Sequence, residues 1–266
     1  MTVAIIGAGV MGETLLSGLI RSGHAVSGLL VGEKRPERAA ELRATYGVDV
    51  VSNVEAAAAD TVLLIVKPQD MTAVLTEIAG VLRPGQLLIS LAAGITTALI
   101  EKQVPEGVAV VRVMPNTPAL VDEGMAAVSA GSHCTPEQLT LAEGLLAATG
   151  HVVRVPEEQQ DAVTAISGSG PAYVFLVVES MIEAGVGLGV PRETAAELVL
   201  QTLVGSAKLL RETGETPGAL RAKVTSPGGT TAAAIAQFEE RQLPEIFVAA
   251  MTAARDRSIE LAGGTR

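Results

Sequence analysis

The chain has 266 residues, of which 48% are hydrophobic and 18% charged, so it can form one large domain or two smaller ones and is too apolar for disorder. A formal net charge of −10 and a scarcity of aromatic residues (2%) argue against a nucleic-acid-binding protein, which needs basic patches and stacking side chains. The single cysteine, Cys134, excludes an intrachain disulfide and a cysteine-rich metal site, and we expect no metal centre.

The N-terminal residues lack the pattern of a secretory signal peptide, because no basic residue precedes their apolar run and glycines interrupt that run. Residues 162–178 carry no charge, but they include glycine, serine, threonine and proline, and Glu179 and Glu183 follow. This stretch is therefore a poor membrane span. We expect a cytoplasmic protein without membrane contact, whose most apolar helix is covered by a second subunit.

The first element is the apolar run Val3–Ile6, which ends at a glycine-rich turn and is typical of a buried parallel strand. Gly7 permits the tight turn, Gly9 lets a pyrophosphate approach the backbone, and Gly12 lets the next helix pack closely. That helix, expected at 11–22, directs free N–H groups at the phosphates. The alternative is a glycine turn with a purely steric role. The expected cofactor contacts here are Ile6, Gly7, Ala8, Gly9, Val10, Met11 and Gly12.

The second strand, expected at 26–31, is followed by charged residues where a dinucleotide fold reads the adenosine ribose. An acidic residue here favours NAD by accepting from the ribose hydroxyls, and basic residues favour the 2′-phosphate of NADP. Glu33 argues for NAD. Three cations, Lys34, Arg35 and Arg38, can instead clamp a phosphate. We expect NADP(H) to be preferred, with NAD(H) as the alternative; a solvated helix start is the other interpretation of these cations.

Helices and strands then alternate as far as Pro156. The expected helices are 36–46, 56–59, 71–81, 96–102 and 136–149, and the expected strands are 48–51, 61–66, 87–91, 108–113, 126–130 and 152–155. This alternation predicts a Rossmann-type doubly wound sheet. Further expected cofactor contacts are Asn53, Val66, Lys67, Pro68, Ala92, Ala93 and Asn116.

Three of these positions have a specific reason. Lys67 ends an apolar strand at the carboxyl edge, where open α/β sheets bind ligands, so it can contact the cofactor or donate a proton. Small residues at 92–94 leave room for a nicotinamide ring. Two prolines keep 114–118 in a rigid loop, in which Asn116 can orient cofactor or substrate.

Beyond Pro156 the strands stop, and helices are expected at 157–183, 192–212, 217–223, 227–239 and 244–262. We therefore expect an α/β protein in which a dinucleotide-binding Rossmann domain at 1–156 is followed by an all-α domain at 157–266.

Two stretches of the helical half depart from ordinary helix. Residues 167–173 place small residues inside an apolar pattern, which permits close approach by a ligand or another backbone. In 224–231, Ser226 suits an N-cap and Pro227 the first helical position. A helix start of this kind is a candidate carboxylate site, and the alternative is a well-capped helix with nothing bound. Its candidate ligand groups are Ser226, Gly228, Gly229, Thr230 and Thr231.

At these residues the chain resembles the pyrroline-5-carboxylate reductase family over nearly its whole length. The resemblance lies in 5–9, 66–69, 114–118, 161–173 and 226–231, and the last two motifs are specific in combination. It implies an oxidoreductase that reduces the C=N bond of 1-pyrroline-5-carboxylate with NAD(P)H to give L-proline, the last step of proline biosynthesis (EC 1.5.1.2). It also implies a homodimer through the helical domain, with a decamer of five dimers as a further expectation.

The same resemblance implies roles for individual residues. The substrate carboxylate would lie at 226–231 with Thr231 near the imine nitrogen, so Ser226 and Thr231 are the expected catalytic residues and Ser169 a further substrate contact. Many members carry Asn-Arg or Ser-Arg after the second strand, whereas this chain has Glu33-Lys34-Arg35. That departure leaves the coenzyme preference open.

The glycine-rich motifs contain no His, Lys, Asp or Glu, which suits an imine better than a ketone. A ketone reductase must supply a proton donor for the alkoxide, whereas a protonated cyclic imine mainly needs positioning. Tyr173 and Lys223 are the remaining candidate donors. One alternative is a β-hydroxyacid dehydrogenase-like enzyme, but 165–182 lacks the lysine that such enzymes use. The other is a non-catalytic NADPH-binding protein.

Overall fold

Strands of the N-terminal part form one sheet in the order β3-β2-β1-β4-β5-β6-β7-β8, in a computed structural model that describes residues 1–263. The strands are β1 (Val3–Ile6), β2 (Leu29–Gly32), β3 (Asp49–Val51), β4 (Thr61–Leu64), β5 (Leu87–Ser90), β6 (Ala109–Met114), β7 (Gly124–Ala130) and β8 (Gly150–Arg154). Neighbours are parallel except β6 and β7. The strand order runs outwards in opposite directions from β1 and β4, and open α/β sheets bind ligands at such a switch point.

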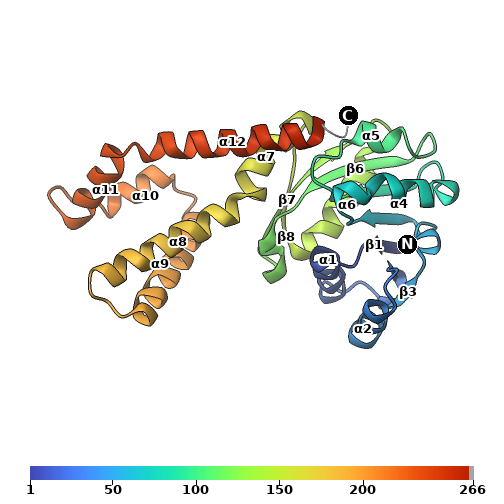
Figure 1. The fold of residues 1–266 in the computed structure, drawn as a ribbon, viewed down its shortest axis with the longest axis horizontal. Helices are drawn as coiled ribbons and strands as arrows, with labels where there is room; N and C mark the ends of the chain where they lie inside the picture. The colour runs from blue at the N-terminus through green and yellow to red at the C-terminus, as the bar shows by residue number, and fades with distance from the viewer. Residues whose placement is uncertain (264–266) are drawn as a thin grey trace. The chain divides into compact units, whose positions relative to one another are not determined.

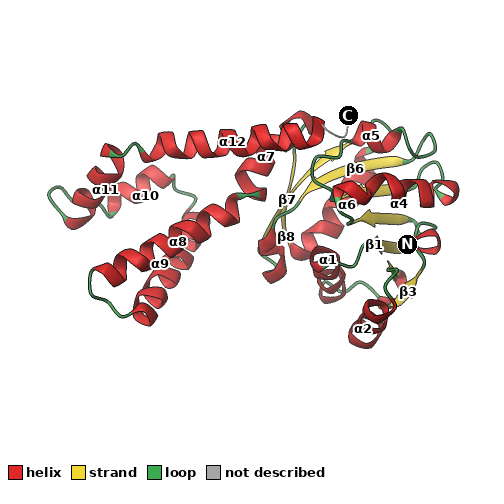
Figure 2. Cartoon of the chain, in the orientation of Figure 1, coloured by secondary structure: helices red, strands yellow, loops and turns green. Residues whose placement is uncertain are grey.

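Figure 1 shows the α-helices of the described residues, coloured from blue at the N-terminus to red at the C-terminus. They are α1 (Val10–Arg21), α2 (Pro36–Tyr46), α3 (Asn53–Ala56), α4 (Met71–Ile78), α5 (Thr97–Glu101), α6 (Pro136–Leu146), α7 (Gln160–Val163), α8 (Gly170–Gly187), α9 (Arg192–Thr213), α10 (Pro217–Lys223), α11 (Thr230–Glu240) and α12 (Leu243–Gly263). Strands lie only within the first 154 of these residues. Figure 2 draws the rest of the described chain as helices and loops.

β1 shows why the strands are apolar on both faces. Val3 and Ile5 join the core layer formed with α1, α2 and α6. Ala4 and Ile6 join the opposite layer, formed with α3, α4 and α5. Each of the four residues is at most 1% exposed, as expected for a parallel sheet with helices on both sides. The Rossmann-type α/β class predicted from the alternation of elements is confirmed.

Two elements near the ribose end of the sheet differ from their predicted bounds. The strand expected at 26–31 opens with a 3-10 turn at Val26–Gly28 and pairs only as β2. The helix expected at 56–59 begins earlier, as α3, because Ser52 and Glu55 form a capping box. The Glu55 N–H donates to Ser52 Oγ (3.2 Å), and the Ser52 N–H donates to the Glu55 carboxylate (2.9 Å). Asn53 therefore stands at the start of a helix.

The helix expected at 157–183 is interrupted by a π-helical turn at Thr164–Gly168, between α7 and α8. The Ser169 N–H donates to the Thr164 carbonyl (2.8 Å), five residues back. This wider turn leaves the Ser167 carbonyl free to accept from the Asn116 side chain (3.1 Å). Asn116 thus ties the loop after β6 to the π turn.

The contacts of the chain divide it into two compact units, residues 1–169 with the segment from Ala253 onwards, and residues 170–252. The end of α12 belongs with the sheet because Ser258 donates to the Asp161 carboxylate (2.8 Å). The division at residue 156 expected above marks where strands give way to helices, and it stays a prediction.

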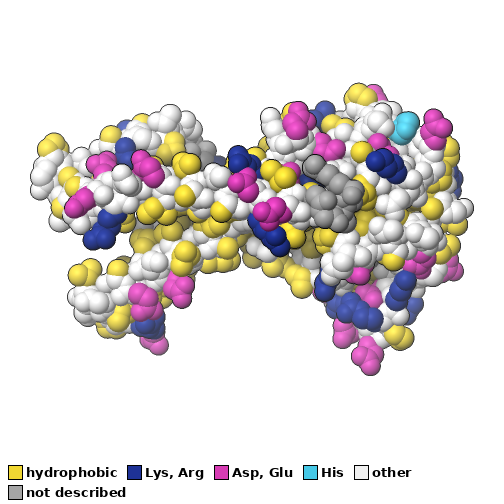
Figure 3. Space-filling view, turned by 45° about the horizontal axis from the view of Figure 1, so that its top comes forward, with side chains coloured by type: hydrophobic (Ala, Val, Ile, Leu, Met, Phe, Trp, Pro, Cys, Tyr) yellow, Lys and Arg dark blue, Asp and Glu magenta, His cyan; other side chains and the backbone are white. Residues whose placement is uncertain are grey.

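Within the helical unit, α8 and α9 pack so closely that a Cβ at Gly185 would lie 3.2 Å from the Ala195 Cβ. Their other faces leave large apolar side chains exposed in the single chain, and Figure 3 shows hydrophobic side chains over these helices. The most exposed of them include Phe175, Leu176, Leu198, Leu200 and Val204. A surface of this kind needs a covering partner.

The stretch Glu157–Gly187 is long and apolar enough to cross a membrane by length and composition alone, and 6% of its most apolar window is buried in the single chain. An uncovered subunit interface gives the same pattern, because a helix that packs on a second copy is also apolar and exposed in one chain. The absence of membrane contact stays a prediction.

Candidate active site

The turn between β1 and α1 has the geometry that its glycine pattern predicts. Gly7 has a φ of +102°, and a Cβ there would collide with the Ile65 carbonyl. A Cβ at Gly12 would collide with the Gly7 carbonyl oxygen, so the fold itself requires both glycines. A Cβ at Gly9 would meet nothing within 4 Å. Gly9 therefore borders open space, which a ligand can use.

The N-terminus of α1 is uncapped. Gly9 is the N-cap residue and supplies no side-chain acceptor, and the helix begins at Val10, one residue earlier than predicted. The first N–H groups of a helix have no partner within the helix, so these are left for a ligand anion. An uncapped helix start beside open space fits the pyrophosphate of a dinucleotide.

A groove of about 360 Å³ adjoins this turn. It is lined by Ile6, Gly7, Gly32, Glu33, Lys34, Asn53, Val66, Asp70, Ala73 and Val74. These residues come from the carboxyl ends of β1, β2 and β4 and from the helices that follow β3 and β4. Six of the expected cofactor contacts are thus brought together, namely Ile6, Gly7, Glu33, Lys34, Asn53 and Val66.

Charged residues at the ribose end of this groove are paired with one another. The Glu33 carboxylate accepts from Arg35 Nε and Nη2 (both 3.0 Å) and from the Arg35 backbone N–H (2.9 Å). Hydrogen bonds from Arg35 hold the pKa of Glu33 below its usual value, although burial opposes this. Lys34 donates to the Glu77 carboxylate (2.8 Å), which also accepts from the Asn53 side chain (3.0 Å).

Arg38 supports the glycine turn. It is partly buried, donates to the Ala8 carbonyl (3.2 Å) and pairs with Glu13 and Glu41. The alternative interpretation, that this cation is a solvated side chain at a helix start, is therefore wrong for Arg38. No local pattern indicates this role, because Ala8 and Arg38 lie thirty positions apart in the chain.

A second cavity, of about 830 Å³, lies at the carboxyl ends of β4 and β5 within the sheet unit. It is lined by Pro68, Gln69, Ala93, Gly94, Thr164, Ser169, Ala254, Arg257, Ser258, Glu260 and Leu261. Three expected contacts, Pro68, Ala93 and Ser169, are therefore neighbours here. No pattern in the sequence indicates that residues of α12 line this cavity.

The remaining expected contacts lie outside both cavities. Lys67 is exposed between Val66, which lines the groove, and Pro68, which lines the second cavity. Ala92 is 2% exposed. Asn116 is engaged with the chain, since it accepts from the Met125 N–H (2.8 Å) and donates to the Ser167 carbonyl.

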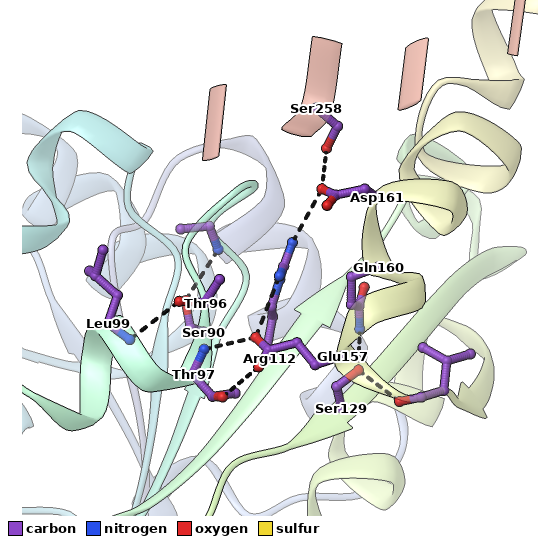
Figure 4. A network of polar contacts seen from close by, with 12 residues as sticks. Ser90, Thr96, Thr97, Leu99, Arg112, Ser129, Glu157, Gln160, Asp161 and Ser258 are labelled. Carbon is purple, nitrogen blue, oxygen red and sulfur yellow. Dashed lines mark hydrogen bonds and ion pairs between the residues drawn. The ribbon is translucent and has the colours of Figure 1, made fainter. Parts of the chain in front are cut away.

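A buried polar network fixes the end of α12 beside the sheet, as Figure 4 shows. Arg112 is 5% exposed and lies 3.4 Å from the Glu157 carboxylate and 3.9 Å from that of Asp161. Glu157 also accepts from the backbone N–H (2.8 Å) and hydroxyl (2.6 Å) of Thr97. Asp161 accepts from Ser258 of α12 (2.8 Å). The network therefore joins β6, α5, α7 and α12.

The motif 226–231 lies in the helical unit, and its predicted capping is wrong. Ser226 is not the N-cap. The Gly229 N–H donates to the Ser226 carbonyl (3.0 Å) across a tight turn with Pro227 second and Gly228 third, and α11 begins at Thr230. Gly228 has a φ of +72°, which a right-handed helix cannot contain but which a type II turn requires at this position.

The helix start lies at Thr230, three residues later than predicted. Gly229 is the N-cap of α11 and offers no side-chain cap, so the N–H groups of the first turn, from Thr230 onwards, are the available anion donors. Thr231 is half-buried, and Thr230 is exposed.

The two candidate proton donors, Tyr173 and Lys223, differ in their hydrogen bonding. Lys223 is paired with Glu215 (2.5 Å), whereas the buried Tyr173 hydroxyl has no partner among the described residues.

Known proteins resemble the chain along its whole length. Residues 157–261 match the family described as pyrroline-5-carboxylate reductase dimerisation, and residues 2–94 match NADP oxidoreductase coenzyme F420-dependent. The chain is 46% identical to the pyrroline-5-carboxylate reductase of Corynebacterium melassecola, covering 98% of each chain. It is 44% identical to that of Mycobacterium tuberculosis, covering 97% of this chain and 96% of the other.

Solved structures agree. A pyrroline-5-carboxylate reductase from Coxiella burnetii superposes with a TM-score of 0.94 at 39% identity, covering 98% of each chain. The Plasmodium falciparum enzyme, with NADP bound, superposes with a TM-score of 0.87 at 30% identity over the same shares. This chain belongs to the pyrroline-5-carboxylate reductase family.

Proposed function

We propose that this chain reduces 1-pyrroline-5-carboxylate to L-proline with NAD(P)H, the final step of proline biosynthesis. The observation that carries the proposal is the near-complete match to reductases of this name. The site chemistry supports it, because an uncapped helix start beside Gly9 suits a pyrophosphate and a second uncapped start at Thr230 suits a small carboxylate.

The chain's own task in this reaction is positioning. The reduced nicotinamide supplies the hydride, and a protonated imine that receives it at carbon becomes a neutral amine, so no side chain has to donate a proton at that step. The N–H groups of the first α11 turn and the hydroxyls of Ser226 and Thr231 hold the substrate carboxylate, and Thr231 lies by the imine nitrogen. A Cβ at Gly228 would meet nothing within 4 Å, so the turn is open there, whereas a Cβ at Gly229 would collide with the Ser226 hydroxyl.

Thr231→Ala tests this assignment. We expect a fall in kcat/KM for pyrroline-5-carboxylate of roughly tenfold, the order expected when one hydrogen bond to a charged group is lost. Thr231→Ser should retain most of the activity, because the hydroxyl remains. Steady-state kinetics measure both, and Thr213→Ala, on the exposed end of α9, is the control. Equal kinetics for Thr231→Ala and the parent would remove Thr231 from the site.

The coenzyme proposal is NADP(H) as the preferred coenzyme, with NAD(H) as an alternative. Lys34 and Glu33 line the groove, and Arg35 is exposed beside them, so a 2′-phosphate has cations within its surroundings. The Plasmodium falciparum relative carries NADP. Remaining expected contacts, Ala8, Val10, Met11, Lys67, Pro68, Ala92, Ala93 and Asn116, are assigned to the same coenzyme.

The chain forms a homo-oligomer through its dimerisation region. We assign the dimer contact to the exposed apolar face of α8 and α9, and we propose that five such dimers form a decamer. A cytoplasmic location and the absence of membrane contact are part of the same proposal.

Phe175→Glu should dissociate the dimer. Phe175 is 65% exposed in the single chain, so the charge costs a monomer little, whereas an interface would bury it unpaired. Light scattering during size-exclusion chromatography measures the mass. Val153→Glu, at a 42% exposed position of β8, is the control and should leave the mass unchanged. A Phe175→Glu protein of parental mass would place the dimer contact elsewhere.

A steady-state assay with pyrroline-5-carboxylate and each coenzyme tests the function directly. Reduction of the imine supports the proposal. Oxidation of 3-hydroxyisobutyrate or 6-phosphogluconate, with no imine reduced, would favour a β-hydroxyacid dehydrogenase. Tight NADPH binding without turnover of any imine would favour a non-catalytic binding protein.

A further inference from the structure

The first three basic residues after β2 are each held by a carboxylate of the chain itself. Lys34 pairs with Glu77 (2.8 Å), and Arg35 pairs with Glu33 (3.0 Å). Arg38 pairs with Glu41 (3.0 Å) and Glu13. A coenzyme 2′-phosphate can therefore bind Lys34, Arg35 or Arg38 only by competing with an internal carboxylate, while the next cation, Arg43, donates to the Val50 carbonyl.

Of these pairs, Glu33 and Arg35 are placed for such competition. The Glu33 side chain is 7% exposed and lines the groove, while the Arg35 side chain is 67% exposed. The long arginine side chain can swing towards a ligand, whereas the glutamate is fixed at the strand end. Arg38, by contrast, is 22% exposed and braces the Ala8 carbonyl, so moving it would disturb the glycine turn.

The two coenzymes make opposite demands on this pair. The 2′-hydroxyl of NAD(H) donates a hydrogen bond, which a carboxylate accepts; the 2′-phosphate of NADP(H) carries only acceptors, which repel a carboxylate and bind a guanidinium. Glu33 Oε1 accepts two hydrogen bonds from Arg35 and Oε2 accepts one, so Oε2 retains an acceptor site. Lowering of its pKa by the Arg35 hydrogen bonds keeps Glu33 ionised at neutral pH.

We propose that Glu33 determines the coenzyme specificity of this chain by competing with the 2′-phosphate for the Arg35 guanidinium. When NADPH binds, the phosphate takes Arg35 from Glu33. When NADH binds, the Glu33–Arg35 pair stays intact and Glu33 accepts from the ribose hydroxyls. The inference rests on the proposed function, since it concerns the adenosine end of the same coenzyme site. It implies that Glu33 weakens a preference for NADP(H) that Arg35 alone would make stronger.

Glu33→Gln is the informative variant because it removes the charge and little else. Its amide oxygen can still accept from the Arg35 backbone N–H, so the turn at 33–35 is retained. We expect the ratio of kcat/KM for NADPH to that for NADH to rise roughly tenfold, the size of one charge-assisted hydrogen bond. NADPH should bind more tightly and NADH more weakly. Glu37→Gln, an exposed glutamate in the first turn of α2, removes the same charge nearby and should leave the ratio unchanged.

Arg35→Ala, and the double variant that combines it with Glu33→Gln, test whether Glu33 competes with the phosphate for Arg35. Arg35→Ala should lower the NADPH-to-NADH ratio, because the phosphate loses its partner. If Glu33 acts by holding Arg35, then Glu33→Gln should raise NADPH affinity less in the Arg35→Ala background than in the parent. An equal gain in both backgrounds would show simple repulsion and overturn the competition.

Coenzyme dissociation constants, measured by titrating the fluorescence of NADPH and NADH on the oligomeric enzyme, provide a readout independent of turnover. A ratio unchanged by Glu33→Gln, or changed equally by Glu37→Gln, overturns the role of Glu33. If the parent enzyme reduces pyrroline-5-carboxylate with neither coenzyme, the proposed function fails instead. The titration still reports on Glu33 in that case, so the two failures are distinguishable.

Discussion

Gly9→Ala should weaken the binding of both coenzymes by more than about tenfold and leave the fold intact, the loss expected when a methyl group displaces a closely bound phosphate. The backbone at Gly9 is extended, with φ −72° and ψ −169°, so alanine can adopt it without strain. Its methyl would meet no protein atom within 4 Å. The methyl would instead occupy the space from which a pyrophosphate approaches α1.

Gly12→Ala provides the contrast on the same turn. Its Cβ would collide with the backbone carbonyl of Gly7, so this variant should lose coenzyme binding and thermal stability together. Fluorescence titration and thermal melting at one protein concentration measure the two properties. A Gly9→Ala enzyme that binds NADPH as the parent does would show that the pyrophosphate does not pass over Gly9.

The sheet half of the molecule could be predicted from sequence because its signals are local. An apolar run such as 61–66, with no polar face, indicates a strand covered on both sides, and Gly7 and Gly12 are needed for reasons that lie within a few residues. Bounds shifted where a capping signal was overlooked, as at Ser52 and Glu55 before α3.

The candidate site was less predictable because its pairings are distant in sequence. Nothing near Lys34 indicates that Glu77, forty-three positions on, will neutralise it. Ser258 meets Asp161 across ninety-seven positions. The helix start at 226–231 was misplaced for another reason, since Pro and Gly in succession suit a turn as well as a helix N-terminus, and Gly228 adopts the turn.

Arg112→Met should cost about 3 kcal/mol of unfolding free energy, the lower part of the range for breaking a buried ion pair on one side. Arg112 is 5% exposed and faces two carboxylates, those of Glu157 and Asp161. Removing the cation leaves both without their counter-charge, although their hydrogen bonds from Thr97 and Ser258 remain. Those hydrogen bonds, and the 25% and 18% exposure of the two carboxylates, keep the cost below the top of the range.

Urea unfolding at a fixed protein concentration measures this loss. Arg192→Met is the matched control, because its pair with Glu183 is exposed on both sides and should contribute no measurable stability. Ser258→Ala separates the stability of the network from its attachment to α12, since it removes one hydrogen bond to Asp161 and leaves Arg112 in place. Because the end of α12 lines the cavity beside Ala93, Ser258→Ala should raise the KM for substrate or coenzyme. It should cost less unfolding free energy than Arg112→Met. An Arg112→Met protein as stable as Arg192→Met would mean that the two carboxylates are satisfied without a cation, and the network would then be held by Thr97 and Ser258 alone.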